Sequence, residues 1–158
     1  MVIVSLLILM LIPAFQTLQA RAEKGRCAGN LSSLYVAAQG YVSDHQRWPQ
    51  IAPQLLTTNN KAYAKQWVEV LRPYKVAEVN WICPTTQRLL KNPDYRNNPK
   101  LVRVDYIACP FDPAPFTPNR WATMPWFVER GDVHAEGNLI VFTDGSIRSL
   151  RDVIKARR

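Results

Sequence analysis

Apolar residues fill the start of the chain and then continue as one face of a helix. Residues 1–15 read MVIVSLLILMLIPAF and carry no charge, and residues 16–43 contain no proline. Within that stretch, apolar side chains recur in steps of four, three, four and three, at Cys27, Leu31, Leu34, Ala38 and Tyr41. This spacing places them on one face of an α-helix. The pattern predicts one long helix that is apolar at its start, with a kink at Pro13.

The apolar start has three interpretations, and each sends the rest of the chain out of the cytoplasm. As a complete membrane helix, residues 1–15 are too short, because they span about 22 Å of a hydrocarbon core roughly 30 Å thick. A secretory signal peptide accounts for the small residues Ala20 and Ala22, but no basic residue precedes the apolar run. The remaining part of a longer membrane helix needs no further assumption and is the interpretation that we favour.

The chain of 158 residues has room for one domain of ordinary size. We therefore expect residues 1–22 to form a membrane anchor segment. Residues 23–158 are expected to form a globular domain that includes the lower stem helix to about residue 46.

Shorter elements are predicted beyond Trp48-Pro49. Residues 61–71 form a second helix candidate, and residues 77–82 and 101–108 have the composition of strands. Prolines predict loops near residues 92–93, 98–99 and 110–118.

The clearest local signal lies near the C-terminus. Asp144-Gly145 separates residues 138–143 from residues 146–150, and both runs are rich in strand-forming residues. The pattern predicts an antiparallel hairpin with a two-residue turn, in which both central residues must tolerate positive φ.

The net charge of the chain is +8, from 20 Lys and Arg against 12 Asp and Glu. This excess favours anionic partners such as nucleic acid, acidic lipid or acidic polysaccharide, without choosing among them. Basic residues cluster only at the C-terminal end, at Arg148, Arg151, Lys155, Arg157 and Arg158. Such a tail is either a solvated end or a contact for phosphate groups that does not read sequence. We favour the solvated end.

His134 is the centre of a weak candidate metal site. Asp132, Glu136 and Asp144 lie near it in sequence, and carboxylate and imidazole ligands suit calcium or zinc. A hairpin needs Asp144-Gly145 for backbone reasons alone, however, and one histidine is not a cluster. We therefore expect a structural turn and a hydrogen bond from His134 into the hairpin. No catalytic residues and no cofactor are expected, with calcium as the alternative.

The three cysteines are interpreted through the expected compartment. Cys83 and Cys109 each follow a strand-like run and precede a proline. In an oxidising compartment these two strand ends could be bridged, with a stabilisation of about 2–4 kcal/mol. Cys27 is expected to act as a small buried hydrophobe of the stem. A fully reduced set of cysteines is the alternative, and the spacing is not that of a zinc site.

A series of short motifs runs through most of the chain. A C-x-x-N-L motif begins at Cys27, followed by Y-x-x-D at Tyr41, Trp48-Pro49, Cys83-Pro84, and His134 with nine residues between it and Asp144-Gly145. This series resembles that of bacterial prepilin-type, pseudopilin-like proteins with an H-x9-D-G signature. The cleavage-site glycine and the F-T-L-I-E segment of that family are not found here. We therefore expect either that residues upstream of Met1 are missing or that the processing site has been lost.

The resemblance implies an α+β fold of the type IV pilin kind. A long N-terminal stem helix, embedded in the membrane at its start, packs on a small antiparallel β-sheet with a C-terminal hairpin. The implied function is that of a non-catalytic subunit of a type IV pilus or type II secretion-like assembly. It is anchored by one pass in the inner membrane, with its globular domain in the periplasm or at the cell surface. The implied partners are other pilin-like subunits or components of the secretion machine.

A second function class stays open. The same scaffold, secreted or anchored, could serve as a binding domain for an anionic ligand such as a polysaccharide or nucleic acid, or for a metal. Nucleic acid is the less favoured of these partners.

Overall fold

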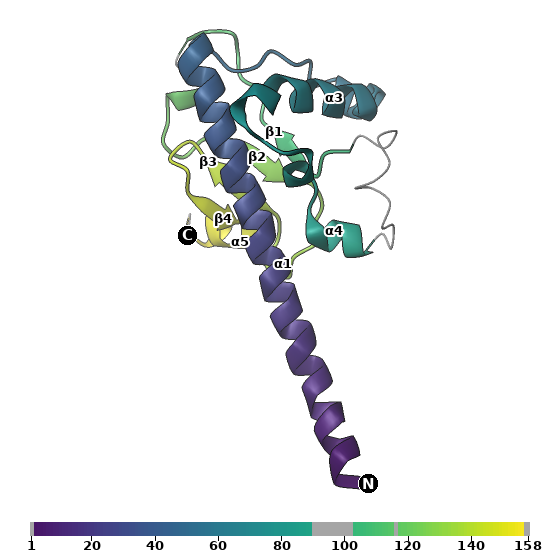
Figure 1. Cartoon of the computed structure of the whole chain (residues 1–158). Coiled ribbons are helices and arrows are strands. Elements are labelled where there is room, and N and C mark those ends of the chain that lie inside the picture. The colour runs from purple at the N-terminus through teal and green to yellow at the C-terminus, as the bar shows by residue number, and fades with distance from the viewer. Residues whose placement is uncertain (1, 90–102, 116, 157–158) are drawn as a thin grey trace.

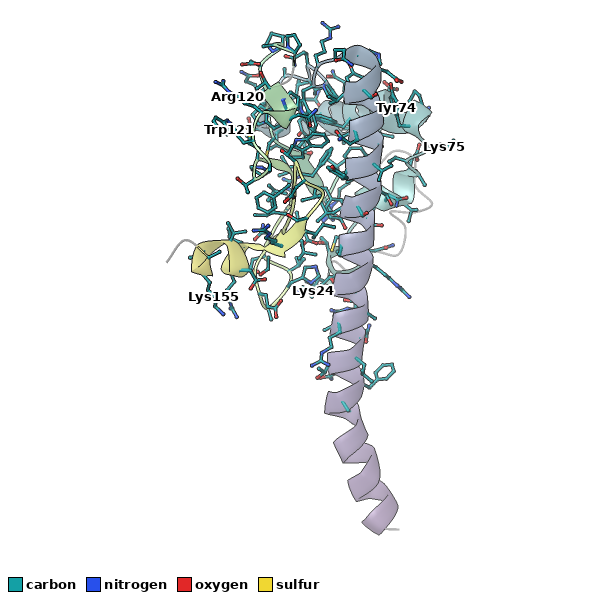
Figure 2. All side chains as sticks on the ribbon, turned by 90° about the vertical axis from the view of Figure 1, so that its left-hand side faces the viewer. Lys24, Tyr74, Lys75, Arg120, Trp121 and Lys155 are labelled. Atoms are coloured by element: carbon teal, nitrogen blue, oxygen red, sulfur yellow. The ribbon has the colours of Figure 1, made fainter. Side chains whose placement is uncertain are left out.

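The computed structural model describes residues 2–89, 103–115 and 117–156. Helix α1 (Val2–His45) carries the rest of the described chain on its C-terminal half, and its N-terminal half projects from this globular body (Figure 1). Figure 2 shows that the body begins near the level of Lys24. The predicted α+β class and the long N-terminal helix are confirmed. Within the described part of the chain, no helix is both long enough and apolar enough to cross a membrane.

The buried face of α1 follows the predicted stripe. Cys27, Leu31, Leu34 and Ala38 are fully buried against the body. At the C-terminal end of the helix, the stripe predicted that Tyr41 is buried. Tyr41 is only partly buried, and the next residue, Val42, is buried instead. Helix α1 continues through position 13 without a break.

Four short strands form an antiparallel sheet in the order β1-β2-β3-β4. Their bounds are β1 (Tyr106–Ala108), β2 (Pro125–Glu129), β3 (Leu139–Phe142) and β4 (Ile147–Ser149). Helix α1 lies across the sheet and contacts β2, β3 and β4 (Figure 1). The small antiparallel sheet implied by the resemblance is therefore present, and α1 packs on it.

Shorter helices complete the body: α2 (Leu55–Thr58), α3 (Asn60–Leu71), α4 (Pro84–Leu89) and α5 (Leu150–Lys155), with the 3₁₀ turns η1 (Arg72–Tyr74), η2 (Glu78–Trp81) and η4 (Thr117–Asn119). Helix α3 confirms the predicted second helix. It begins at Asn60 because the side chain of Asn59 accepts a hydrogen bond from the backbone N–H of Ala62, which caps the helix.

The strand predicted at residues 77–82 is wrong, because this segment forms the 3₁₀ turn η2. Its backbone N–H groups bond locally, from Asn80 to Ala77 and from Ile82 to Val79, and not to a neighbouring strand. The composition that predicted a strand belongs to a turn in which one side chain, Trp81, is buried and residues 77–79 are exposed.

The strand predicted at residues 101–108 is only partly present. Residues 103–105 are not in a strand, and the ladder is confined to β1. Residues 101–102, the loops expected near residues 92–93 and 98–99, and the basic residues at 157–158 lie outside the described residues.

An aromatic cluster forms the centre of the body. Trp48, Trp67, Trp81, Trp126 and Phe127 are buried and meet in tilted or edge-to-face pairs. The ring centroids of these pairs lie 5.0 to 6.5 Å apart, within the range of favourable aromatic contacts. The cluster links the end of α1 to α3, η2 and β2, so it unites the helical and sheet parts in one core.

The C-terminal hairpin is present, but its turn differs from the prediction. β3 and β4 pair with Val141 opposite Ile147. The N–H of Gly145 donates to the carbonyl of Phe142, and the N–H of Phe142 donates to the carbonyl of Ser146. The loop is therefore the three-residue kind, and only its last residue, Gly145, has positive φ (+77°).

The conformation of Gly145 gives a first prediction. A Cβ atom at this position would lie 3.1 Å from the ring of Tyr35 on α1, in addition to the backbone strain. We expect Gly145→Val to lower the free energy of unfolding by about 1–3 kcal/mol, measured by urea denaturation.

The matched control is Gly25→Ala, because a Cβ at Gly25 would meet no atom within 4 Å. This change should raise stability by up to about 1 kcal/mol, since alanine is the better helix former. Unchanged stability of Gly145→Val would show that the loop does not have this conformation.

Candidate functional site

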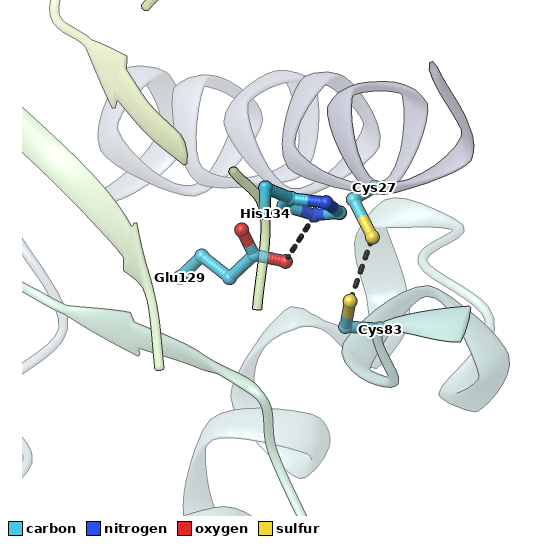
Figure 3. Close-up of side chains that lie close together, drawn as sticks. All are labelled: Cys27, Cys83, Glu129 and His134. Carbon is cyan, nitrogen blue, oxygen red and sulfur yellow. Dashed lines mark hydrogen bonds and ion pairs between the residues drawn. The ribbon is translucent and has the colours of Figure 1, made fainter. Parts of the chain in front are cut away.

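Four side chains with metal-ligating atoms converge between α1 and the body. Cys27, Cys83, Glu129 and His134 are all buried, and their ligand atoms lie within 4.8 Å of one another (Figure 3). We refer to these four residues as the Cys–Glu–His cluster. It is the one grouping of at least three such side chains among the residues that the structure describes.

Each member of the cluster comes from a different element. Cys27 lies on the buried face of α1, and Cys83 precedes α4. The backbone N–H of Cys83 donates to the buried carboxylate of Asp105 at 2.9 Å, which fixes the chain at this point. Glu129 is the last residue of β2, and His134 lies in the loop that leads to β3. Packing of α1 on the sheet therefore assembles the cluster.

The two sulfur atoms form one half of the cluster. The Sγ atoms of Cys27 and Cys83 lie 2.7 Å apart, and both side chains are fully buried. Both residues are free cysteines in the structure. Cys27, expected to be an isolated buried hydrophobe, is thus the neighbour of Cys83.

Cys109, the expected partner of Cys83, is placed at the other side of the aromatic core. Its backbone N–H donates to the carbonyl of Trp126 at 2.9 Å, and it lines a small cavity with Trp48 and Tyr63. Burial raises the pKa of the Cys109 thiol to about 11. The arrangement thus differs from the predicted Cys83–Cys109 bridge, because the order of strand ends in sequence does not give their neighbours in space.

Glu129 and His134 form the other half of the cluster. The Nε2 atom of His134 lies 3.2 Å from Oε1 of Glu129, and Oε2 accepts the backbone N–H of Leu139 at 3.3 Å. The hydrogen bond of His134 therefore goes to β2, and not directly into the hairpin as expected. Glu129 links it to the hairpin through Leu139, the first residue of β3.

The other residues of the predicted metal site lie elsewhere. Asp132 is exposed, and Asp144 accepts the backbone N–H of Ser146 at 2.9 Å, as a turn residue does. That interaction with Ser146 lowers the pKa of Asp144. Glu136 pairs with Lys24 of α1. Over the described residues, neither Asp132 nor Asp144 joins His134 in a set of ligands, so the weak candidate metal site of these three residues is not assembled there.

The electrostatics of the cluster are coupled. The hydrogen bond from the Cys27 thiol lowers the pKa of Cys83 to about 5, and the same bond, together with burial, raises the pKa of Cys27. Burial raises the pKa of Glu129 to about 7, and the nearby Cys83 adds to this rise while His134 opposes it. Of the two sulfurs, Cys83 is therefore the one that loses its proton more readily.

Two kinds of chemistry suit such an arrangement. Two thiolates, one imidazole and one carboxylate are a ligand set for tetrahedral zinc. Two adjacent cysteines, one of which loses its proton readily, can also form a disulfide by exchange with a donor disulfide, because the thiolate is the species that attacks the donor.

Sequence reasoning singled out two members of the cluster as site residues, took Cys27 for a residue of the core, and missed Glu129. The two site residues were His134 and Cys83. Glu129 follows the strand-forming residues Trp126 and Phe127, and a carboxylate at a strand end is ordinarily solvated. No motif marks Glu129, and only its burial by α1 and the 130–138 loop gives it a role.

No family model, curated protein or solved structure matches this chain.

The raised pKa of Glu129 predicts a pH-dependent stability. The folded state binds the proton of Glu129 more tightly than the unfolded state does. The stabilisation that this proton contributes is therefore fully present below about pH 4.5 and is lost as the pH rises through about 7. The loss is on the order of 3 kcal/mol. We expect Glu129→Gln to flatten this fall, measured by urea denaturation from pH 4.5 to 8.

The exposed glutamate Glu69 on α3 offers the control. In Glu69→Gln the free energy of unfolding should fall with pH as steeply as in the unmodified protein. If Glu129→Gln retained that slope as well, the proton uptake would belong to another group.

Proposed function

We propose that this protein is a non-catalytic, pilin-like structural subunit in which the projecting half of α1 mediates assembly. The observation that carries the proposal is the exposure of the described side chains on that half of the helix, at position 12 and from position 14 to position 22. Phe15 is 69% exposed and Leu18 is 63% exposed, and the helix projects from the body at this level (Figures 1 and 2).

Physical chemistry supports a partner for this segment. Helical stability in proteins comes mainly from packing an apolar face, and each large apolar side chain gains about 1.5–3 kcal/mol on full burial. In a single copy of the chain this free energy of full burial is not gained at three apolar side chains that are exposed: Ile12, Phe15 and Leu18. Equivalent helices of neighbouring copies, packed side by side, would bury them. This is the arrangement that a subunit with a stem helix allows.

The attachment of α1 to the body also supports a structural role. Glu23 is the first buried residue among the described side chains of α1, and its carboxylate accepts hydrogen bonds of 2.8 and 3.0 Å from Arg88 of α4. Further along, Asn30 donates to the carbonyl of Ile82 at 3.0 Å, and the Tyr35 hydroxyl donates to the carbonyl of Thr143 at 2.9 Å. A force applied to the stem is thereby transmitted to both the helical and the sheet parts of the body.

Membrane attachment is part of the proposal. The uncharged residues 1–15 support insertion of the start of the stem into the inner membrane, with the body in the periplasm or at the cell surface. The compartment, like the partners, follows from the resemblance in sequence motifs.

The first prediction of this proposal concerns the anchor. We expect the full chain to fractionate with membranes, because residues 1–15 are apolar and continuous with the stem. A chain reduced to residues 23–158 should be soluble and folded, since it keeps Glu23 and the whole buried face of α1. Sedimentation after cell lysis and circular dichroism of the shorter chain measure both. Quantitative solubility of the full chain would contradict membrane anchoring.

The second prediction concerns assembly. A photo-crosslinking benzoylphenylalanine at position 15 or 18 of the full chain, in membranes, should give adducts of twice the chain mass after irradiation. These positions lie on the projecting half of α1, where helices of neighbouring copies are proposed to meet.

The same group at position 36 provides the control. Val36 is 63% exposed on the part of α1 that carries the body, so it matches Leu18 in exposure but not in position. Adducts at neither 15 nor 18 would reject assembly through the stem, whatever the outcome of the fractionation.

A further inference from the structure

The sulfur pair joins two segments that are far apart in sequence. Cys27 lies in the first buried turns of α1, and Cys83 lies 56 residues further on, at the start of α4. Their sulfur atoms face each other at 2.7 Å in a fully buried site (Figure 3). We propose that Cys27 and Cys83 form a disulfide that fastens the stem helix to the body.

The geometry favours this bond over a zinc ion. Two thiolates bound to one tetrahedral zinc at about 2.3 Å each lie about 3.8 Å apart. The observed separation is 2.7 Å, so zinc would have to push the sulfurs apart by about 1 Å. Both sulfurs are in a dense core, which resists such a movement.

The other two members of the cluster do not need a metal. Both carboxylate oxygens of Glu129 have partners, one in His134 and one in the N–H of Leu139. A metal would have to replace at least one of these bonds. The Glu129–His134 pair is thus accounted for as a buried polar contact between β2 and the loop that follows it.

Disulfide formation here is an ordinary thiol–disulfide exchange with a donor disulfide, either a protein or a small molecule. The Cys83 thiolate attacks one sulfur of the donor and forms a mixed disulfide, releasing the first donor thiolate. Cys27 then loses its proton and attacks the Cys83 sulfur, which releases the second donor thiolate. The two cysteines give up two electrons and two protons in total, and the donor becomes two thiols.

The burial of both sulfurs determines at which stage of folding the reaction takes place. Neither sulfur is accessible once α1 is packed, so the exchange with the donor belongs to folding, before the stem closes on the body. The bond then locks α1 beside the Glu23–Arg88 pair. This inference does not depend on assembly, because the bond lies within one copy of the chain.

Trypsin offers a direct test, because each cysteine falls on its own peptide. Cleavage after Arg and Lys gives residues 27–47, 76–88 and 104–120, which carry Cys27, Cys83 and Cys109 in turn. The full chain, refolded with oxidised glutathione, is unfolded in guanidinium with N-ethylmaleimide and without reductant, then digested and analysed by mass spectrometry. We expect peptide 27–47 linked to peptide 76–88, and peptide 104–120 alkylated.

Two variants serve as controls for the assignment. Cys109→Ser should keep the linked pair, whereas Cys83→Ser should leave peptide 27–47 alkylated. The protein refolded under reducing conditions should have a Tm about 10 °C below that of the oxidised protein, because the bond closes a loop of 56 residues.

Three results would overturn the proposal. They are alkylation of both Cys27 and Cys83 in the unreduced protein, a link from either of them to Cys109, and one zinc ion per chain in native mass spectra with both thiols reduced. The analysis of the unmodified protein decides the matter even if a cysteine variant fails to fold.

Discussion

Burial of one face of α1 is the interaction on which the rest of the structure depends. Leu31, Leu34 and Ala38 are fully buried, and the sheet, the 3₁₀ turn η2 and helices α3 and α4 all contact this helix. The strands are only three to five residues long, and so small a sheet needs a packed face to be stable. Without α1, the body would lose the element that covers β2 and β3. The stem is therefore both the part that projects and the part that completes the core.

Polar groups on the same face fix the position of α1 along its axis. Apolar packing alone is non-directional, and a helix of this length could slide by one turn while keeping its apolar side inward. Glu23 and Asn30 prevent this, because both would be buried without the partners that they have in Arg88 and in the carbonyl of Ile82. The axial position of α1 in turn decides which residues meet at its lower buried end. The Cys–Glu–His cluster is a consequence of that position.

The Cys–Glu–His cluster lies where the projecting half of α1 meets the body, so the two features are related in the proposed function. A stem that bears load in an assembly must not separate from the body, and the contacts that hold it begin where the projecting half ends, at Glu23 and Cys27. An ion pair with Arg88, which is half exposed, is screened by salt and weak by itself. A covalent bond at the next buried turn is not screened. The proposed disulfide would therefore supply what the polar contacts cannot.

Local patterns in the sequence determined the helix and the hairpin. Helices depend on residues three or four apart, and strands on residues two apart. The stripe from Cys27 to Ala38 gave α1, and the runs around Asp144-Gly145 gave the hairpin. The strand predicted at residues 77–82 was wrong because a short run of strand-like composition also fits a turn with one buried tryptophan, and only the neighbouring backbone decides between them. Even the hairpin loop was one residue longer than predicted, and its Gly145 lies close to the ring of Tyr35 on α1. The pairing of Cys83 with Cys27, and the burial of Glu129 against His134, were decided by tertiary structure alone. Contacts across 56 residues leave no periodicity in the sequence, because they depend on how α1 packs against the body and not on local chain geometry.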